Sequence, residues 1–343
     1  MALAKTRSLG LKLISRLTLA GLLLAGGGTS AQAGAAQPGE MASVIGPTVR
    51  VYVPFAAGGE SDGSARNFVK SATRLGGQAY EIVNLTADSG GAASRAVRAA
   101  PPDGRMLLLA RVGSMAILPA MSPLTAVPAS EFTVLGVLDQ APLICAVRTG
   151  SPITSMRELQ AAIAAAPGRL RYSTAGARTL QSLAVRQLLS LSGLAGDAAR
   201  PVHFSQGTQA TQALLDGEVD FSCNNARSVV PLVQAGTLRA LMTTAQGRLK
   251  VLPQLHNAAE LGLRDMQQLQ GWSALLGPPG MPPALVASWR ELLDKIADDP
   301  EWQAGTEALG AAPRIRAVRD PAQFLRQQAQ FFERLVTLLG ALP

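Results

Sequence analysis

Cysteine, histidine and aromatic residues are scarce in this chain. Its 343 residues include only two cysteines and two histidines, and aromatic residues make up 4%. His203 and His256 lie far apart, without cysteines or acidic clusters at ligand spacing, which argues against a zinc site. Because lysines and arginines are scattered and aromatic residues are few, we expect no surface for binding nucleic acid.

The two cysteines, Cys145 and Cys223, both lie in apolar runs that have the pattern of strands. Two interpretations stay open. The cysteines could pair as a disulfide in an oxidising compartment, or they could be buried thiols that only pack against their neighbours.

The chain also lacks the motifs of familiar enzymes. It contains no nucleophile elbow, no Walker loop, no HExxH helix and no Cys-His pair in a matching context. Asp62, an acid in the most prominent loop, is expected to cap a helix rather than to act as a base. A secreted α/β enzyme is therefore the less favoured alternative to a binding protein.

The first 33 residues have the pattern of a secretory signal peptide. Four basic residues precede an apolar run at 17–25, and Ala31-Gln32-Ala33 has the small-x-small form of a cleavage site. No cysteine comes directly after the apolar run, where a lipid would be attached, so we expect no lipid anchor. The sequence predicts export to the periplasm, cleavage near Ala33 and a flexible mature N-terminus at 34–46.

The clearest local pattern is a strand, a glycine loop and a helix between residues 49 and 77. The strand at 49–53 runs into Gly58 and Gly59, and Ser61 and Asp62 are expected to be N-caps of the helix that follows. Uncapped amide groups at such a helix start suit a carboxylate or another anion. The alternative is that the glycines only make a tight turn.

Short strands and helices alternate after this loop, which is the pattern of a helix-covered parallel sheet. The apolar stretch 134–147 is long for one strand, and we expect it to cross into a second lobe, with the strand at Trp272 crossing back. The sequence thus predicts an α/β fold with two lobes. Lobe 1 is expected at 47–144 and 251–343, and lobe 2 at 145–250. Ligands of such folds bind where loops leave the carboxyl ends of strands.

Several motifs occur together in the order and spacing of one known family. They are PFAAGG-x-x-D-x-x-x-R (54–66), PPDG (101–104), VDFSCNN (219–225), AGTLRAL (235–241), ELG (260–262), the Trp272 strand and PPGMP (278–282). In these motifs the chain resembles the Bug solute receptors, the extracytoplasmic binding proteins of tripartite tricarboxylate transporters.

The resemblance implies a periplasmic binding protein fold, type 2-like, with two parallel or mixed sheets covered by helices. It implies a monomer that closes on a small carboxylated ligand without a cofactor and delivers it to the membrane permease subunits. A receptor that presents its ligand to a membrane sensor kinase is the alternative partner that the sequence leaves open.

The resemblance also implies the residues of the site. In the family, a loop from each lobe holds a ligand carboxylate, largely through backbone amides and ordered water. Carried over by position, the first loop contributes Phe55, Ala57, Gly58, Gly59 and Asp62, and the second contributes Thr174, Ala175 and Gly176.

Four further positions are included because the chain departs from the family pattern near them. Arg111, followed shortly by Ser114, stands where small hydroxyl residues or glycines are usual, Arg178 stands where glycine is usual, and Asn224 replaces a common aspartate. A less acidic cleft with two arginines predicts a more anionic ligand. Alternatively, both arginines are solvated rim residues or members of ion pairs.

Overall fold

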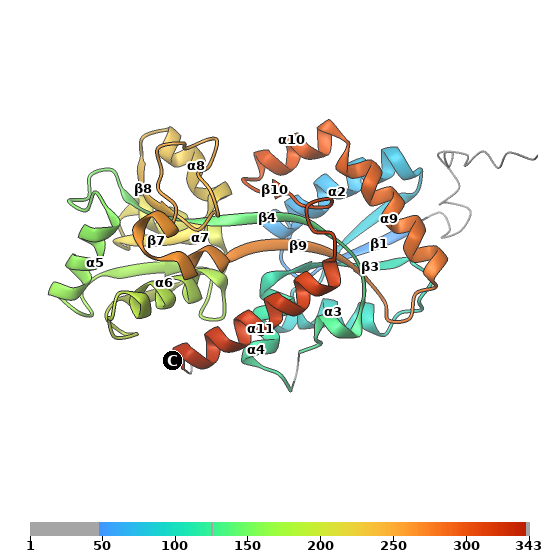
Figure 1. Ribbon diagram of the computed structural model, residues 1–343, viewed down its shortest axis with the longest axis horizontal. Coiled ribbons are helices and arrows are strands. Elements are labelled where there is room, and N and C mark those ends of the chain that lie inside the picture. Colours follow the sequence, from blue (N-terminus) through green and yellow to red (C-terminus); the bar gives the residue numbers. More distant parts are fainter. Residues whose placement is uncertain (1–47, 125, 341–343) are drawn as a thin grey trace, which may run out of the picture. The chain divides into compact units, whose positions relative to one another are not determined.

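A ten-stranded mixed sheet runs through the part of the chain that the computed structural model describes, residues 48–124 and 126–340 (Figure 1). The strands follow the order β2-β1-β3-β9-β4-β7-β5-β6, and β8 and β10 also pair with β4. The predicted signal peptide (1–33) and flexible N-terminus (34–46) lie outside the described residues.

The strands expected at 49–53 and 134–147 are present, with bounds that differ by one residue at most. The strands are β1 (Thr48–Val53), β2 (Ala79–Asn84), β3 (Met106–Arg111), β4 (Thr133–Arg148), β5 (Arg171–Thr174), β6 (Arg200–His203), β7 (Phe221–Asn225), β8 (Leu238–Thr243), β9 (Gln270–Gly277) and β10 (Ala312–Pro313). Pairing is parallel among β1, β2 and β3 and among β5, β6 and β7, whereas every pair formed by β4 or β9 is antiparallel.

The 16-residue strand β4 makes the sheet continuous. Its first part pairs with β9, and its second part pairs with β7 and β8. At about 3.3 Å per residue, a strand of this length reaches roughly 50 Å, enough to form ladders at both ends. The expectation of two separate sheets is therefore corrected to one large mixed sheet, although the apolar run at 134–147 is the long strand expected.

Ten α-helices lie in the described part of the chain. They are α2 (Glu60–Gly76), α3 (Gly91–Arg98), α4 (Leu118–Met121), α5 (Met156–Ala165), α6 (Leu180–Leu191), α7 (Gly207–Asp216), α8 (Ala226–Gln234), α9 (Pro283–Ala297), α10 (Pro300–Ala308) and α11 (Pro321–Leu339). Figure 1 shows α5 to α8 around one end of the sheet and α2, α3, α9 and α10 around the other. The last helix, α11, contacts β4, α4 and α6.

Alternate residues of β4 enter different parts of the core, as the two-residue repeat of a strand requires. Leu143, Cys145 and Val147 belong to a cluster that extends to α6 and α11. Ile144 and Ala146 point to the opposite face, in a cluster with residues of α7 and α8. A third cluster packs α2 and α9 on β1. Both faces of the sheet are thus covered, which explains the nearly continuous apolar runs in its central strands.

One local expectation is wrong. Ser61 and Asp62, expected to be N-caps, lie inside α2, whose N-cap is Gly59. Asn224 and Asn225 are the last residues of β7. Helix α8 contains Pro231, although proline normally interrupts a helix. No helix in the described ranges is long and apolar enough to cross a membrane.

Candidate functional site

The loop between β1 and α2 is held in shape by Asp62. The Asp62 Oδ2 atom accepts a hydrogen bond from the Gly58 amide at 2.9 Å and another from Arg66 Nε at 2.7 Å. Gly58 has φ +78°, a conformation that suits glycine. Asp62 therefore closes the loop onto the start of α2, in a structural role related to the capping role expected from the sequence.

Burial alone would raise the pKa of the Asp62 carboxyl. The hydrogen bonds from Arg66 and from the Gly58 amide outweigh burial, so the pKa lies below its ordinary value. Asp62 thus keeps its charge at neutral pH although its side chain is buried. An ionised carboxylate in this position also interacts favourably with the positive end of the α2 dipole.

The three residues before α2 are exposed or half-buried. Ala57 and Gly58 are exposed, and Gly59 has extended φ and ψ angles without a capping side chain among the described residues. The first amides of a helix have no partner within it. No side chain of the described residues caps this helix start, and the anion site that the sequence places there stays a prediction.

Phe55 and Ser114, both expected at the site, are engaged in local contacts. The Phe55 carbonyl accepts a hydrogen bond from Asn84 Nδ2 at 2.9 Å, and its ring lies against Gly113. Ser114 is buried, and its hydroxyl donates to the Arg111 carbonyl at 3.1 Å. These contacts bring the ends of β1 and β3 together, and they fix the backbone on this side of the site.

Arg111 is buried among acids and hydroxyl groups of the protein itself. Its side chain is 10% exposed, and Nη1 donates to Ser273 Oγ at 2.5 Å and lies 3.7 Å from Asp139 Oδ1. Nη2 lies 3.8 Å from Glu60 Oε2. Asp139 is further held by the hydroxyls of Ser64 and Ser273, at 2.6 and 2.9 Å. The interpretation of Arg111 as a solvated rim residue is therefore wrong, because the guanidinium belongs to a buried ion-pair network.

Arg178 differs from Arg111. It is exposed, and its Nη1 atom makes one long hydrogen bond of 3.4 Å to Ser122 Oγ. A contact of this length between exposed groups contributes little to stability. Arg178 thus keeps an accessible guanidinium on the surface beside the 174–176 loop.

The loop after β5 is shaped by threonine hydroxyls. Thr174 Oγ1 accepts from the Gly176 amide at 3.1 Å and contacts His203 Nδ1 at 2.8 Å. Thr179 caps α6 and also donates to the Gly176 carbonyl at 2.7 Å. Gly176 has φ +126°. Among the described residues, no hydrogen bond joins the 174–176 loop, which includes Ala175, to the 55–59 loop. The two expected halves of the site are therefore not in direct hydrogen-bond contact.

Asn224 serves the fold. It is buried at the end of β7, and its Nδ2 donates to the Gly207 carbonyl at 2.7 Å and to Thr211 Oγ1 at 2.6 Å. Its Oδ1 accepts from Gln181 Nε2 at 3.2 Å and from the Asn225 amide at 2.8 Å. The side chain is thereby satisfied by α6, α7 and its own strand.

Glu60 connects the start of α2 with the end of β7 and the start of α8. The sequence analysis does not include it among the site residues. Its carboxylate accepts hydrogen bonds from Asn225 Nδ2 at the end of β7 and, at 3.4 Å, from Ser228 Oγ in α8. Burial raises the pKa of this carboxyl, although nearby Arg111 and Arg227 and the two hydrogen bonds oppose the shift. The sequence did contain a signal for Glu60. It is an acid directly after Gly58 and Gly59 at the start of a helix, next to the loop that is expected to bind the ligand.

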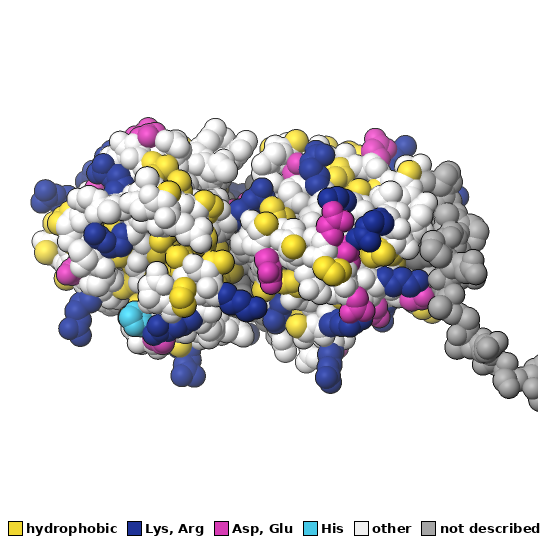
Figure 2. Space-filling view, turned by 90° about the horizontal axis from the view of Figure 1, so that it is seen from above, with side chains coloured by type: hydrophobic (Ala, Val, Ile, Leu, Met, Phe, Trp, Pro, Cys, Tyr) yellow, Lys and Arg dark blue, Asp and Glu magenta, His cyan; other side chains and the backbone are white. Residues whose placement is uncertain are grey.

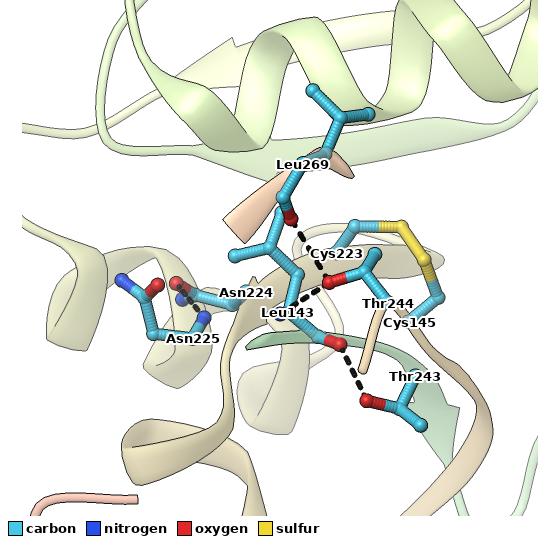
Figure 3. The surroundings of a disulfide bond; sticks show 8 residues. All are labelled: Leu143, Cys145, Cys223, Asn224, Asn225, Thr243, Thr244 and Leu269. Atoms are coloured by element: carbon cyan, nitrogen blue, oxygen red, sulfur yellow. Dashed lines mark hydrogen bonds between the residues drawn. A yellow bond between two sulfur atoms is a disulfide. The ribbon is translucent and has the colours of Figure 1, made fainter. Parts of the chain in front are cut away.

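Cys145 and Cys223 form a disulfide, which decides between the two interpretations that the sequence left open (Figure 3). The residues are direct neighbours on β4 and β7, with a Cα–Cα distance of 3.9 Å. Both cysteines are fully buried. Because Asn224 and Asn225 follow Cys223 immediately, the disulfide fixes the strand that presents both asparagines.

A cavity of about 600 Å³ lies beside α6, at the edge of the sheet formed by β6. Its lining includes Tyr172, Ser182, Arg186, Arg200 and His203. Arg186 already donates to the carbonyls of residues 339 and 340. The cavity wall includes none of the residues expected to hold a ligand. In the described residues, no group of three or more His, Cys, Asp or Glu side chains could hold a metal ion.

Comparison with known proteins identifies the family. Residues 65–340 match the model of the tripartite tricarboxylate transporter family receptor. The chain belongs to this receptor family. It is therefore a solute-binding protein rather than an enzyme, as the sequence predicts.

Individual relatives agree with this assignment. The protein is 27% identical over 293 residues to a protein of the TAR-I ttuE-ttuC' intergenic region of Agrobacterium vitis, covering 85% of this chain and 83% of that protein. It is 24% identical over 317 residues to BugT of Bordetella pertussis, covering 91% of this chain and 95% of that protein.

Solved structures share the fold. MatC of Rhodopseudomonas palustris with bound malate is 28% identical with a TM-score of 0.74, covering 84% of this chain and 99% of that chain. R. palustris Rpa4515 with adipate is 23% identical with a TM-score of 0.78, covering 87% and 98%. The α/β periplasmic binding protein fold is thereby established for this chain.

Proposed function

We propose that this protein captures a small carboxylated metabolite between two lobes and delivers it to the membrane subunits of a tripartite tricarboxylate-type transporter. The observation that carries the proposal is the family match over residues 65–340, together with the uncapped start of α2. A relative with 28% identity was solved with bound malate, which supports a carboxylate as the ligand.

The proposed lobes follow the boundaries expected from the sequence, 47–144 with 251–343, and 145–250. Strands β4 and β9 are the proposed crossings, since both lie at the middle of the sheet order. The surface in Figure 2 is indented between its left and right parts, which supports a cleft that opens and closes. Closure follows when the ligand contacts both lobes and thereby favours the closed state.

In the proposed site, backbone amides at the start of α2 hold the ligand carboxylate. The first side contributes Phe55, Ala57, Gly58, Gly59 and Asp62, with Arg111 and Ser114 behind them, and the second contributes Thr174, Ala175, Gly176, Arg178 and Asn224. The buried contacts of Asp62, Ser114 and Asn224 support a positioning role for these three. Exposed Arg178 supports direct attraction of an anion.

Export is part of the proposal. The pattern of residues 1–33 supports a cleaved signal peptide, and membership of a receptor family whose solved relatives include a periplasmic transporter protein supports a periplasmic location. Delivery to permease subunits is favoured by the family description, and presentation to a sensor kinase remains the second candidate.

A binding screen tests the proposed function. The mature protein is melted in the presence of malate, adipate, further di- and tricarboxylates, monocarboxylates and amino acids, and positive results are titrated by calorimetry. We expect at least one carboxylate to raise the melting temperature and to bind with one-to-one stoichiometry. A folded protein that binds none of these compounds would contradict the proposal.

A further inference from the structure

Glu60 places a carboxylate of the protein itself inside the candidate site. It is the first residue of α2 and follows directly after Gly59 of the proposed ligand loop. Its side chain is 23% exposed and reaches Asn225 and Ser228 of the region formed by β7 and α8. One glutamate therefore links the start of α2 to the end of β7, where Asn224 of the proposed site lies.

The groups around Glu60 are those that a carboxylate of a ligand would use. An amide Nδ2, a hydroxyl and a guanidinium Nη2 at 3.8 Å all face its two oxygens. Charge-assisted hydrogen bonds of this kind are among the strongest contacts available to a carboxylate. As long as Glu60 holds these donors, a ligand carboxylate has to compete with it for them.

The charges in this cluster already balance. Arg111 lies near two acids, Glu60 and Asp139. Arg227 of α8 also attracts the Glu60 carboxylate, and its Nη1 atom lies against Gly63 in the first turn of α2. Two positive and two negative groups leave no net charge, so a further carboxylate would give the partly buried cluster a net negative charge, which is unfavourable.

We propose that Glu60 is a specificity-determining residue, which occupies the subsite for a second carboxylate and restricts the protein to ligands with one carboxylate and an uncharged distal end. This inference rests on the proposed function, because it assumes that the first carboxylate binds at the start of α2. It replaces the expectation of a more anionic ligand, since Arg111 is already compensated by acids of the protein.

Removal of the Glu60 carboxylate changes the preference. In Glu60→Ala, the cluster keeps Arg111, Arg227 and Asp139 and gains a net positive charge beside free donors. A distal carboxylate then restores both the charge balance and the hydrogen bonds. Glu60→Gln removes the charge but keeps a side chain of the same size, and it separates the effect of charge from the effect of space.

Matched pairs of compounds test this inference. Hexanoate and adipate, and butyrate and succinate, have the same chain length and differ in the distal carboxylate. Each is titrated by calorimetry into the wild-type mature protein and into Glu60→Ala and Glu60→Gln. The control is Glu81→Ala, which removes an exposed acid of β2 that pairs with Arg50.

For at least one pair, we expect the wild-type protein and Glu81→Ala to bind the monocarboxylate at least tenfold more tightly than the dicarboxylate. In Glu60→Ala, the ratio shifts at least tenfold toward the dicarboxylate, with a smaller shift in Glu60→Gln. A wild-type protein that prefers the dicarboxylates, with the same ratio in all variants, overturns this inference alone. Binding of neither class to any of the proteins contradicts the proposed function as well.

Discussion

The buried polar residues at the middle of the sheet and the exposed residues of the two proposed ligand loops have different partners. Arg111 and Asn224, at the ends of β3 and β7, form hydrogen bonds with neighbouring protein groups, and Arg111 also lies close to the Asp139 carboxylate. Gly58 and Arg178, in the loops, are exposed. In the first group, the side chains that depart from the family pattern are thus held by protein groups, and we propose that the second group makes the direct contacts to the ligand.

The largest expected effect concerns the disulfide in the buried region. Replacing both Cys145 and Cys223 with alanine should lower the free energy of unfolding by about 4 kcal/mol. The unfolded variant is no longer constrained by a cross-link between residues 78 positions apart, so its conformational entropy is higher. Denaturant unfolding measures the change, and the reduced wild-type protein should behave in the same way. Equal stability of the oxidised and reduced proteins would show that the disulfide does not hold β7 on β4.

The two arginines provide the sharpest contrast between the regions. Arg111→Ala should lower the free energy of unfolding by about 3 kcal/mol, because Asp139 and Glu60 lose their buried countercharge. Arg178→Ala should change it by less than about 0.5 kcal/mol. Both variants are unfolded in urea side by side, and similar losses of stability in the two would contradict the buried role of Arg111 and the exposed role of Arg178.

Gly58→Val tests the exposed loop. A Cβ at this position meets no atom within 4 Å, so the cost to the fold is limited to the positive φ, about 1 to 2 kcal/mol. Binding of the tightest carboxylate should fall at least tenfold, since the loop can no longer present its amides in the same geometry. Gly247→Val, at an exposed glycine with negative φ outside the site, is the control for a general loss of stability. Full-affinity binding by folded Gly58→Val would exclude this loop as the carboxylate site.

Two buried acids should give opposite pH dependences. Burial would raise the pKa of Asp299, but hydrogen bonds from Ser71, Arg74 and the Glu301 amide outweigh it and lower the pKa below 3.8. Stability from Asp299 is thus present above pH 3.8 and is lost as the pH falls through the lowered value. Glu60 has a raised pKa, so its ionisation reduces stability as the pH rises above 4.5.

Urea unfolding of the wild-type protein, Asp299→Asn and Glu60→Gln between pH 3 and pH 7 measures both effects. Asp299→Asn should lose most stability relative to wild type at neutral pH, and this loss should become smaller as the pH falls below 3.8. For Glu60→Gln, the difference from wild type should change in favour of the variant as the pH rises. Parallel pH profiles for all three proteins would contradict both assignments.

The α/β class and the order of strand, loop and helix at 49–77 could be predicted from the sequence, but the single continuous sheet and the Gly59 N-cap could not. Alternating valines before Gly58 and the helix that ends at Gly77 appear as predicted, because local preferences and tertiary packing agree there. The partners of Arg111 could not be predicted. Asp139 and Ser273 come from strands far along the chain. They reach the guanidinium because β9 pairs with β3 and with β4, in a register that places Ser273 opposite both Arg111 and Asp139. The same reason explains why Glu60 went unnoticed, since its partners lie about 165 residues away.

X-ray scattering from the mature protein, with and without the tightest carboxylate found in the screen, tests the central claim most directly. We expect a smaller radius of gyration at saturating ligand, because the carboxylate draws the loops at the start of α2 and at 174–176 together. An unchanged radius at full saturation would contradict closure on the ligand and with it the proposed site between two lobes.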